Sequence, residues 1–188
     1  MSTRDLIVVD IETTSLDTEE AVVLEVAAIN TTTGVELHFV PALPSGWLTK
    51  ADPVSLSVNR YFERRLFDEE LAEDQTLAYY ATLVEMLQSN TFGGSNPRFD
   101  AAILARVLDG YGYATAWHHR LADLAAYTAG SIWLEPTDLP GLDRCCGLLG
   151  VVNEAPHSAL GDARATAKCF ERLDELVHER TNRGEVPL

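Results

Sequence analysis

The sequence predicts one α/β domain, spanning residues 1–188, in which helices flank a mixed central sheet. Short apolar and β-branched runs dominate the first 40 residues, whereas helical spacing of apolar residues dominates the remainder. A length of 188 residues suits a single domain with its own core. No repeat, low-complexity stretch or flexible linker divides the chain. Strands that are followed by helices mixed with strands therefore indicate one mixed sheet.

Three strands are expected near the start of the chain. Residues 6–11 form a short apolar run that ends in acids, which is typical of a buried central strand. Residues 22–32 are rich in β-branched side chains, and residues 35–40 follow after the turn signal Thr33-Gly34. The second and third strands are therefore expected to form a hairpin.

The rest of the chain is expected to be mainly helical. Apolar spacing predicts helices over residues 76–88, 99–108, 139–149 and 159–177. A short segment at 91–96 and a strand within 117–124 are expected between them, while 47–75 suggests only short helices. The polar tail after about residue 180 is expected to fray.

The charge of the chain constrains its partners. Fourteen basic residues stand against 29 acidic ones, which gives a formal net charge of −15. Most proteins that bind nucleic acid neutralise phosphates with lysine and arginine, so this acidity argues against such a partner. Bound divalent cations can supply the missing positive charge. The composition thus either excludes nucleic acid or indicates a metal-dependent enzyme that grips a few nucleotides.

Cysteine usage and hydropathy indicate a cytoplasmic protein. The three cysteines, Cys145, Cys146 and Cys169, show no Cys-x-x-Cys spacing, which argues against a zinc site or a disulfide framework. Buried thiols in a reducing compartment are the expected state. The start of the chain does not read as a signal peptide, and no run of about 18 apolar residues is present to cross a membrane.

The first candidate site is Asp10-Ile11-Glu12, at the end of the first expected strand. Side chains alternate across a strand, so the two acids should point to the same face. Neighbouring carboxylates repel each other, and a hard divalent cation such as Mg²⁺ relieves that repulsion. A solvated strand end is an equally good interpretation of this pair taken alone.

Two further candidates lie later in the chain. Asp100 follows the loop Gly94-Ser95-Asn96 at a junction with a helix, where an ordinary acid interacting with the helix dipole is also expected. His157 precedes Asp162 by five positions at the start of the last helix. A histidine beside a metal site can act as general base, because its pKa lies near the working pH. That spacing alone is weak evidence.

Taken together and in this order, the motifs resemble those of the DEDDh 3′–5′ exonucleases, the DnaQ-like proofreading enzymes and their relatives. The matching segments are Asp10-Ile11-Glu12-Thr13-Thr14-Ser15-Leu16, Gly94-Ser95-Asn96 with Phe99-Asp100, and His157-Ser158-Ala159-Leu160-Gly161-Asp162-Ala163 with Thr166. The resemblance covers residues from about 5 to 175. The joint match is highly specific.

The chain departs from the family pattern at four positions. Ser15 stands where the family usually has glycine, and it would be strained if that position required a positive φ. The family often has histidine at the position of Ser95, and arginine or alanine at those of Ser158 and Gly161. None of these positions is a metal ligand, so they leave substrate preference open rather than activity.

The resemblance implies a ribonuclease-H-like three-layer fold and hydrolysis assisted by two divalent metal ions, Mg²⁺ or Mn²⁺. By analogy, Asp10, Glu12 and Asp162 hold one ion, Asp10 bridges to the second, and Asp100 supports it partly through water. His157 would deprotonate the attacking water. Four carboxylates bring about −4 and two Mg²⁺ about +4, so an acidic protein could accept a phosphate.

The resemblance also suggests which residues contact the substrate. Thr13, Leu16 and Asn96 would lie against the terminal nucleotide, with the apolar Leu16 side chain wedged on the last base. An alternative for Leu16 is a loop residue that plugs the local core. Arg60, Arg64 and Arg65 form a basic cluster that could guide the strand backbone. A solvated helix face paired with nearby acids is as good an interpretation of that cluster.

The expected activity is removal of nucleoside 5′-monophosphates from the 3′ end of single-stranded DNA. Trimming of RNA, as in the oligoribonuclease and RNase T relatives, is the first alternative, because the sequence shows no evident contact to a 2′-hydroxyl. A polymerase-associated proofreading or accessory module is the second, since an acidic surface suits docking on a basic partner. A phosphatase acting on small nucleotides is the third.

Overall fold

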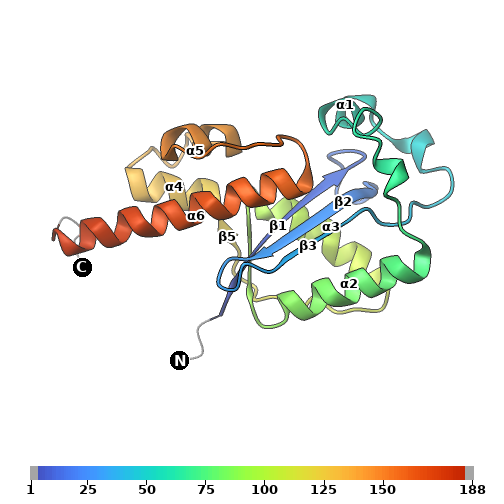
Figure 1. The fold of residues 1–188 in the computed structure, drawn as a ribbon, viewed down its shortest axis with the longest axis horizontal. Helices are drawn as coiled ribbons and strands as arrows, with labels where there is room; N and C mark the ends of the chain where they lie inside the picture. Colours follow the sequence, from blue (N-terminus) through green and yellow to red (C-terminus); the bar gives the residue numbers. More distant parts are fainter. Residues whose placement is uncertain (1–3, 185–188) are drawn as a thin grey trace.

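A five-stranded sheet with helices on both faces forms the centre of the computed structural model, which describes residues 4–184 (Figure 1). The strands are β1 (Leu6–Thr13), β2 (Val23–Asn30), β3 (Glu36–Phe39), β4 (Thr91–Gly94) and β5 (Ala122–Asp123). Their order is β3-β2-β1-β4-β5. The hairpin partners β2 and β3 are antiparallel, as are β1 and β2, whereas β4 runs parallel to β1 and β5. The sheet is therefore mixed, as predicted.

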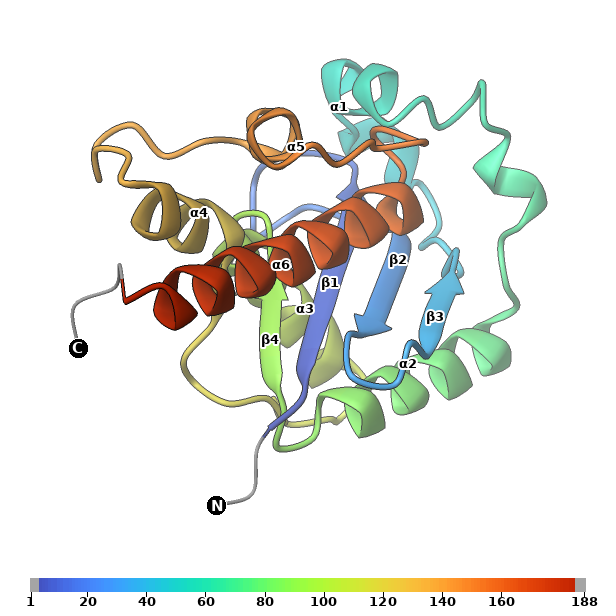
Figure 2. The ribbon, with the colours of Figure 1, turned by 60° about the vertical axis from the view of Figure 1, so that its left-hand side comes forward.

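Helices cover both faces of this sheet. They are α1 (Pro53–Val58), α2 (Glu73–Leu87), α3 (Pro97–Gly110), α4 (Leu124–Ile132), α5 (Leu142–Leu149) and α6 (Ala159–Asn182), with 3₁₀ turns at Trp47–Lys50 and Leu66–Asp68. Figure 2 shows α6 crossing one face of β1 and β2, with α4 and α5 on the same side. Helices α2 and α3 pack on the opposite face. The predicted three-layer α/β architecture is confirmed.

The alternation of side chains along β1 separates the two cores. Ile7, Val9 and Ile11 point into the cluster shared with α2 and α3. Val8 points the other way, into the cluster shared with α4, α5 and α6. Asp10 and Glu12 continue the line of Val8, so the fold carries them to the α6 face at the carboxyl end of the strand. Open α/β sheets commonly bind ligands at this edge.

A smaller core holds α1 and the segment after it beside the end of β1. It consists of Leu24, Val40, Leu56, Tyr61 and Leu66. Two hydrogen bonds join this segment to the strand end: the Asp52 amide donates to the Thr14 carbonyl at 2.8 Å, and the Asn59 side chain donates to the Thr13 carbonyl at 3.2 Å. The region 47–75, which the sequence left poorly defined, therefore packs beside the end of β1 that carries the acids.

One helix was not predicted and several boundaries move. The strand expected within 117–124 shrinks to the two residues of β5, and α4 follows at once. Helix α4 was not predicted, because its sequence LAAYTAGSI is apolar around most of its circumference and gives no clear period. Helix α6 continues to Asn182, beyond the point where fraying was expected, and residues 185–188 lie outside the described part.

Two other expectations concern the cysteines and the membrane. All three cysteines are buried and free, as predicted, and the sulfur atoms of Cys146 and Cys169 lie 3.8 Å apart. Within residues 4–184, no helix combines the length and apolar character needed to span a bilayer.

Candidate active site

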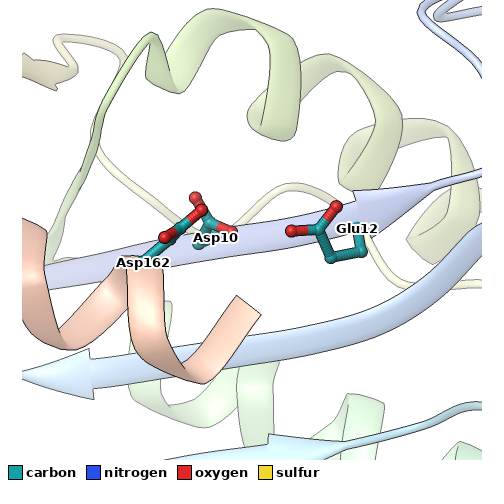
Figure 3. A group of neighbouring side chains, drawn as sticks. All are labelled: Asp10, Glu12 and Asp162. Carbon is teal, nitrogen blue, oxygen red and sulfur yellow. The ribbon is translucent and has the colours of Figure 1, made fainter. Parts of the chain in front are cut away.

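Three carboxylates meet where the first turn of α6 crosses the end of β1. Asp10 and Glu12 come from β1 and Asp162 comes from α6, and one oxygen from each lies within 4.8 Å of the others (Figure 3). All three side chains are half-buried. Residues separated by about 150 positions in the chain therefore form one cluster, as the motif analysis expected. The cause is the packing of α6 on β1.

Asp100 lies directly behind this cluster. It belongs to the first turn of α3, is only 5% exposed, and its Oδ1 accepts a hydrogen bond of 3.0 Å from the Ile11 amide. Strand β4 pairs with β1 only as far as Val8 and Gly93, so beyond that point β1 has a strand partner on its β2 edge but none on its β4 edge. The carboxylate of Asp100 takes the place of the missing partner and binds the backbone between Asp10 and Glu12.

The carboxyl groups of this cluster hold their protons more tightly than ordinary acids. Burial, followed by repulsion from Asp100 and Asp162, raises the pKa of Asp10 well above its usual value. Burial and the charges of Asp162 and Glu25 raise the pKa of Glu12 to about 8. Burial raises the pKa of Asp100 to about 7 and also raises that of Asp162. The site therefore disfavours its own negative charge.

This electrostatic state fits a divalent cation. Oxygen ligands are the ones that Mg²⁺ and Mn²⁺ prefer, and three carboxylate oxygens are already close enough together to share one ion. Positive charge at this point would relieve the repulsion that raises the pKa values. Asp10, Glu12 and Asp162 are therefore the residues that can hold a metal, with Asp100 adjacent.

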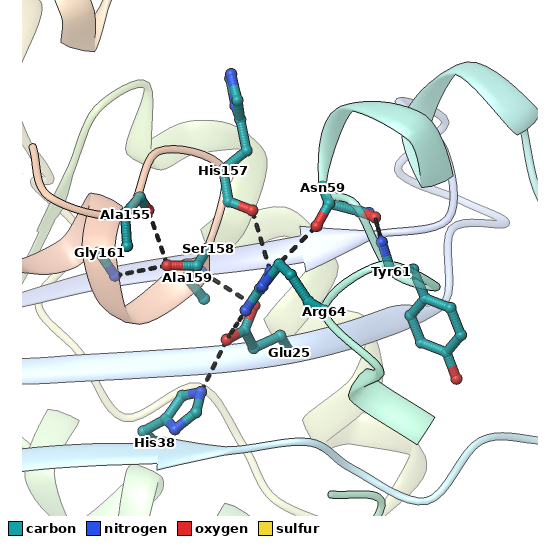
Figure 4. Close-up of polar contacts among 10 residues, drawn as sticks. All are labelled: Glu25, His38, Asn59, Tyr61, Arg64, Ala155, His157, Ser158, Ala159 and Gly161. Atoms are coloured by element: carbon teal, nitrogen blue, oxygen red, sulfur yellow. Dashed lines mark hydrogen bonds and ion pairs between the residues drawn. The ribbon is translucent and has the colours of Figure 1, made fainter. Parts of the chain in front are cut away.

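His157 precedes α6 by two residues and is exposed. Its backbone is left-handed, with φ of 60°. An interaction with His157 partly offsets the rise that burial causes in the pKa of Asp162, which places His157 near the cluster. In Figure 4 the side chain extends away from the polar contacts made by its own backbone. The histidine side chain is thus open to solvent while its main chain is held.

The three predicted substrate contacts differ in their freedom. Leu16 is 80% exposed just beyond β1, so the alternative that it plugs the local core is wrong. Asn96 is exposed and left-handed at the start of α3. Thr13 is buried, and its hydroxyl donates to the Ser15 carbonyl at 2.8 Å. Ser15 is not in the left-handed region, so serine at this position carries no such strain.

Two residues that support the site were not predicted. The side chain of Asn153 donates to Asp162 Oδ1 at 2.6 Å and orients that carboxylate. Glu25 on β2 is only 1% exposed and stands directly across from Glu12 in the strand pairing. The signal for Glu25 was available, since a lone acid interrupts the apolar stretch from Val22 to Ile29. A buried acid requires partners.

The partners of Glu25 include one member of the predicted arginine cluster. Arg64 Nη2 donates to Glu25 Oε1 at 2.6 Å, and His38 Nε2 lies 2.8 Å from the same oxygen (Figure 4). Arg60 and Arg65 instead form exposed ion pairs with Glu63 and Asp68. The interpretation as solvated surface ion pairs therefore applies to Arg60 and Arg65. Arg64 instead forms an ion pair with a buried carboxylate.

The lack of space for a side chain explains why position 161 is a glycine. A Cβ atom built there would lie 2.1 Å from the Ala155 carbonyl oxygen and 2.7 Å from Ser158 Oγ. Ser158 caps α6 by accepting from the Gly161 amide at 3.1 Å, and it donates to the Ala155 carbonyl at 2.8 Å. The loop that carries His157 is thus folded tightly against the first turn of the helix.

Residues 7–170 match the model of the exonuclease family RNase_T. The chain belongs to this family. The match covers all four carboxylates and His157, and it confirms the resemblance to the DEDDh 3′–5′ exonucleases. The cluster of Asp10, Glu12 and Asp162 lies within the residues that match the family model.

Solved structures agree with this assignment at the level of the fold. E. coli exonuclease I in complex with a dT13 oligonucleotide is 16% identical, with a TM-score of 0.68, over 96% of this exonuclease and 43% of that chain. The zinc-bound complex of E. coli ExoI with ssDNA is 17% identical, with a TM-score of 0.71, over 97% and 44%. This exonuclease therefore spans less than half the length of those chains. No curated protein sequence is significantly similar to it.

Proposed function

We propose that this exonuclease removes nucleoside 5′-monophosphates from the 3′ end of single-stranded DNA, using two divalent cations, Mg²⁺ or Mn²⁺. The observation that carries the proposal is the cluster of Asp10, Glu12 and Asp162 with Asp100 behind it. Four acids whose pKa values are raised make poor surface residues and good ligands. The cations would also allow a chain of net charge −15 to accept a phosphodiester.

Each residue has a role in this proposal. Asp10, Glu12 and Asp162 would hold the cations, and Asp100 would support the second cation, as the family resemblance implies, while it also holds the backbone at Ile11. When bound, the cations would activate a water molecule and stabilise the leaving 3′ oxygen. An imidazole nitrogen of His157 accepts the proton from that water. The water oxygen bonds to phosphorus as the bond between phosphorus and the 3′ oxygen of the penultimate nucleotide breaks. That 3′ oxygen takes up a proton from solvent, and the terminal nucleoside leaves with its 5′-phosphate.

The preference for single-stranded DNA is supported by two observations. Leu16 presents an exposed apolar surface shortly after Glu12 in the chain, and an apolar side chain can pack on any base without reading its sequence. One similar solved structure is that of E. coli exonuclease I in complex with a dT13 oligonucleotide. RNA remains the alternative substrate. The complete set of acids together with His157 favours an active enzyme over a non-catalytic polymerase accessory.

Digestion of a 5′-labelled single-stranded DNA oligonucleotide and a matched RNA tests the proposal. With Mn²⁺ the wild type should produce a ladder that shortens from the 3′ end, faster on DNA, and EDTA should abolish it. Asp10→Ala and His157→Ala should each lower the rate by about a thousandfold or more.

His178→Ala is the matched control, because this exposed histidine lies near the far end of α6 and should leave the rate unchanged. Faster digestion of RNA would reassign the substrate to the exoribonuclease class. Absence of cleavage of both polymers by wild type would contradict the proposal.

A further inference from the structure

The buried ion pair between Glu25 and Arg64 holds the backbone on both sides of Ser158. Arg64 Nη1 donates to the His157 carbonyl at 3.1 Å, and Glu25 Oε2 accepts from the Ala159 amide at 3.1 Å. The same two side chains bind each other at 2.6 Å. Figure 4 shows the resulting ring of contacts, from β2 through Arg64 to the loop before α6 and back.

The ring also reaches the strand end that carries the acids. Arg64 Nη1 donates to the Asn59 carbonyl at 3.2 Å, and the Asn59 side chain donates to the Thr13 carbonyl at 3.2 Å. Thr13 directly follows the ligand Glu12 on β1. One arginine therefore connects the segment after the first pair of acids with the segment that carries the histidine.

The contacts are needed because the His157 backbone is not in a relaxed conformation. A left-handed φ of 60° is unfavourable for a residue with a Cβ, and it persists only when the surroundings impose it. The imidazole itself is exposed, so packing around the ring does little to fix its position. The backbone on its carboxyl side is tied to Glu25 and Arg64, and these ties determine where the side chain begins.

We propose that Glu25 and Arg64 are positioning residues, which set the placement of His157 relative to the acidic cluster without touching the substrate. This inference rests on the proposed function for its catalytic consequence. Arg64 is suited to the task because its planar guanidinium donates from two nitrogens in fixed directions, one toward Glu25 and one toward two carbonyls. A lysine could preserve the charge but not this fork.

Arg64→Lys is therefore the decisive variant, and Arg65→Lys is its matched control. Arg65 is the next residue, and its ion pair with Asp68 is exposed. Three quantities would be measured for each protein: Mn²⁺ affinity and stoichiometry by calorimetry, the single-turnover rate and KM on DNA, and the His157 imidazole signal by NMR with Mg²⁺. His157→Gln would assign that signal.

We expect Arg64→Lys to bind Mn²⁺ with the wild-type stoichiometry and within about twofold of the wild-type affinity. Its single-turnover rate should fall by about tenfold or more with KM nearly unchanged, because small misplacements of a catalytic group are costly. Its His157 signal should shift or broaden, and Arg65→Lys should match wild type in every measurement. Unchanged stoichiometry shows that the lost rate does not come from unfolded protein.

A wild-type rate together with an unmoved His157 signal in Arg64→Lys would overturn the proposal. Arg64→Ala should show a larger loss of rate than Arg64→Lys, and the lysine variant decides the question if the alanine variant does not fold. The NMR comparison needs no substrate. A wild type that is inactive on both polymers would contradict the proposed function, while the His157 signal would still support or overturn the positioning role.

Discussion

Glu12 and Glu25 face each other across adjacent strands, yet their environments have opposite effects. Glu12 has acids nearby, and burial with those charges raises its pKa to about 8. Glu25 is more deeply buried, which by itself raises its pKa, but hydrogen bonds from His38 and Arg64 outweigh burial and lower it. The two residues occupy equivalent positions in the strand pairing. Their neighbours differ: Glu12 is repelled by nearby acids, whereas Glu25 forms an ion pair.

This difference shows where each carboxylate obtains the positive charge that compensates its own negative charge. Glu25 receives it from the chain itself, through Arg64, and is complete without a ligand. Within residues 4–184, no ion pair with an arginine or lysine reaches Asp10, Glu12 or Asp162, so a cation from solution can supply the positive charge. The same residue type therefore has a structural role at Glu25 and, in the proposed function, a cation-binding role at Glu12.

The largest expected effect distinguishes these two roles directly. Glu12→Gln should lower the rate of DNA hydrolysis by about a thousandfold because a metal ligand is lost, yet it should raise the thermal midpoint of the metal-free protein at pH 8 by about 5 °C. Glu25→Gln should instead lower the free energy of unfolding by about 2–3 kcal/mol, because Arg64 loses its charge partner.

Urea denaturation and differential scanning calorimetry, both with EDTA, would measure these changes. Asp143→Asn, at an acid in the first turn of α5, serves as the control and should change stability little. If Glu12→Gln destabilised the metal-free protein as much as Glu25→Gln does, the inference that Glu12 is repelled by its neighbours while Glu25 is stabilised by its ion pair would be wrong.

The second prediction concerns pH and metal. Between about pH 4.5 and 8 the folded, metal-free protein retains protons on Glu12 and its neighbours that the unfolded chain has already lost, so its stability should fall as pH rises. Glu25, whose pKa is lowered, acts in the opposite sense and loses its stabilising effect only at more acidic pH. Thermal midpoints with EDTA should therefore drop between pH 6 and pH 8.

Mg²⁺ or Mn²⁺ should offset this loss, because the ligands must release protons to bind the cation. The metal-induced rise in thermal midpoint should be larger at pH 8 than at pH 6, by about 5 °C. Calorimetry in buffers of different ionisation enthalpy would detect the released protons. A metal effect that is independent of pH would show that the cluster is already ionised.

The smallest expected effect is at His38. Its Nε2 lies 2.8 Å from Glu25 Oε1, but Arg64 and the Ala159 amide continue to bind Glu25 when the imidazole is removed. His38→Ala should therefore lower the free energy of unfolding by only about 1 kcal/mol and leave the hydrolysis rate within about twofold of wild type. A loss as large as that of Glu25→Gln would assign the stability of the ion pair to His38 rather than Arg64.

The parts of the fold that depend on local pattern were predictable. The β1 strand shows its buried run and the β2–β3 hairpin its turn signal, and α6 shows a regular apolar period. Helix α4 was not predicted from the sequence, because a helix that is apolar around most of its circumference gives no alternation of apolar and polar faces. The two-residue β5 could be placed only within residues 117–124, because the bounds of so short a strand depend on its neighbour β4 rather than on its own residues.

The candidate site divides in the same way. Asp10, Glu12, Asp100, His157 and Asp162 were identified because their residue types and order follow a known motif. Asn153, Glu25 and Arg64 belong to no such motif, and their importance appears only when β2, the 59–64 turn and the start of α6 meet. The arginine cluster at 60–65 shows this limit, since its three members look equivalent in sequence and only Arg64 becomes partly buried and pairs with a buried carboxylate.

The sequence alone determined the chemistry of this protein: which acids and which histidine are available, and on which face of β1 the first two must point. That much follows from residue type and from the alternation of a strand. The tertiary structure alone decided which charges are neutralised within the chain and which are left for a cation. The reason is that a pKa depends on distance and burial, and these were set by the packing of α6 and Arg64 around two facing carboxylates.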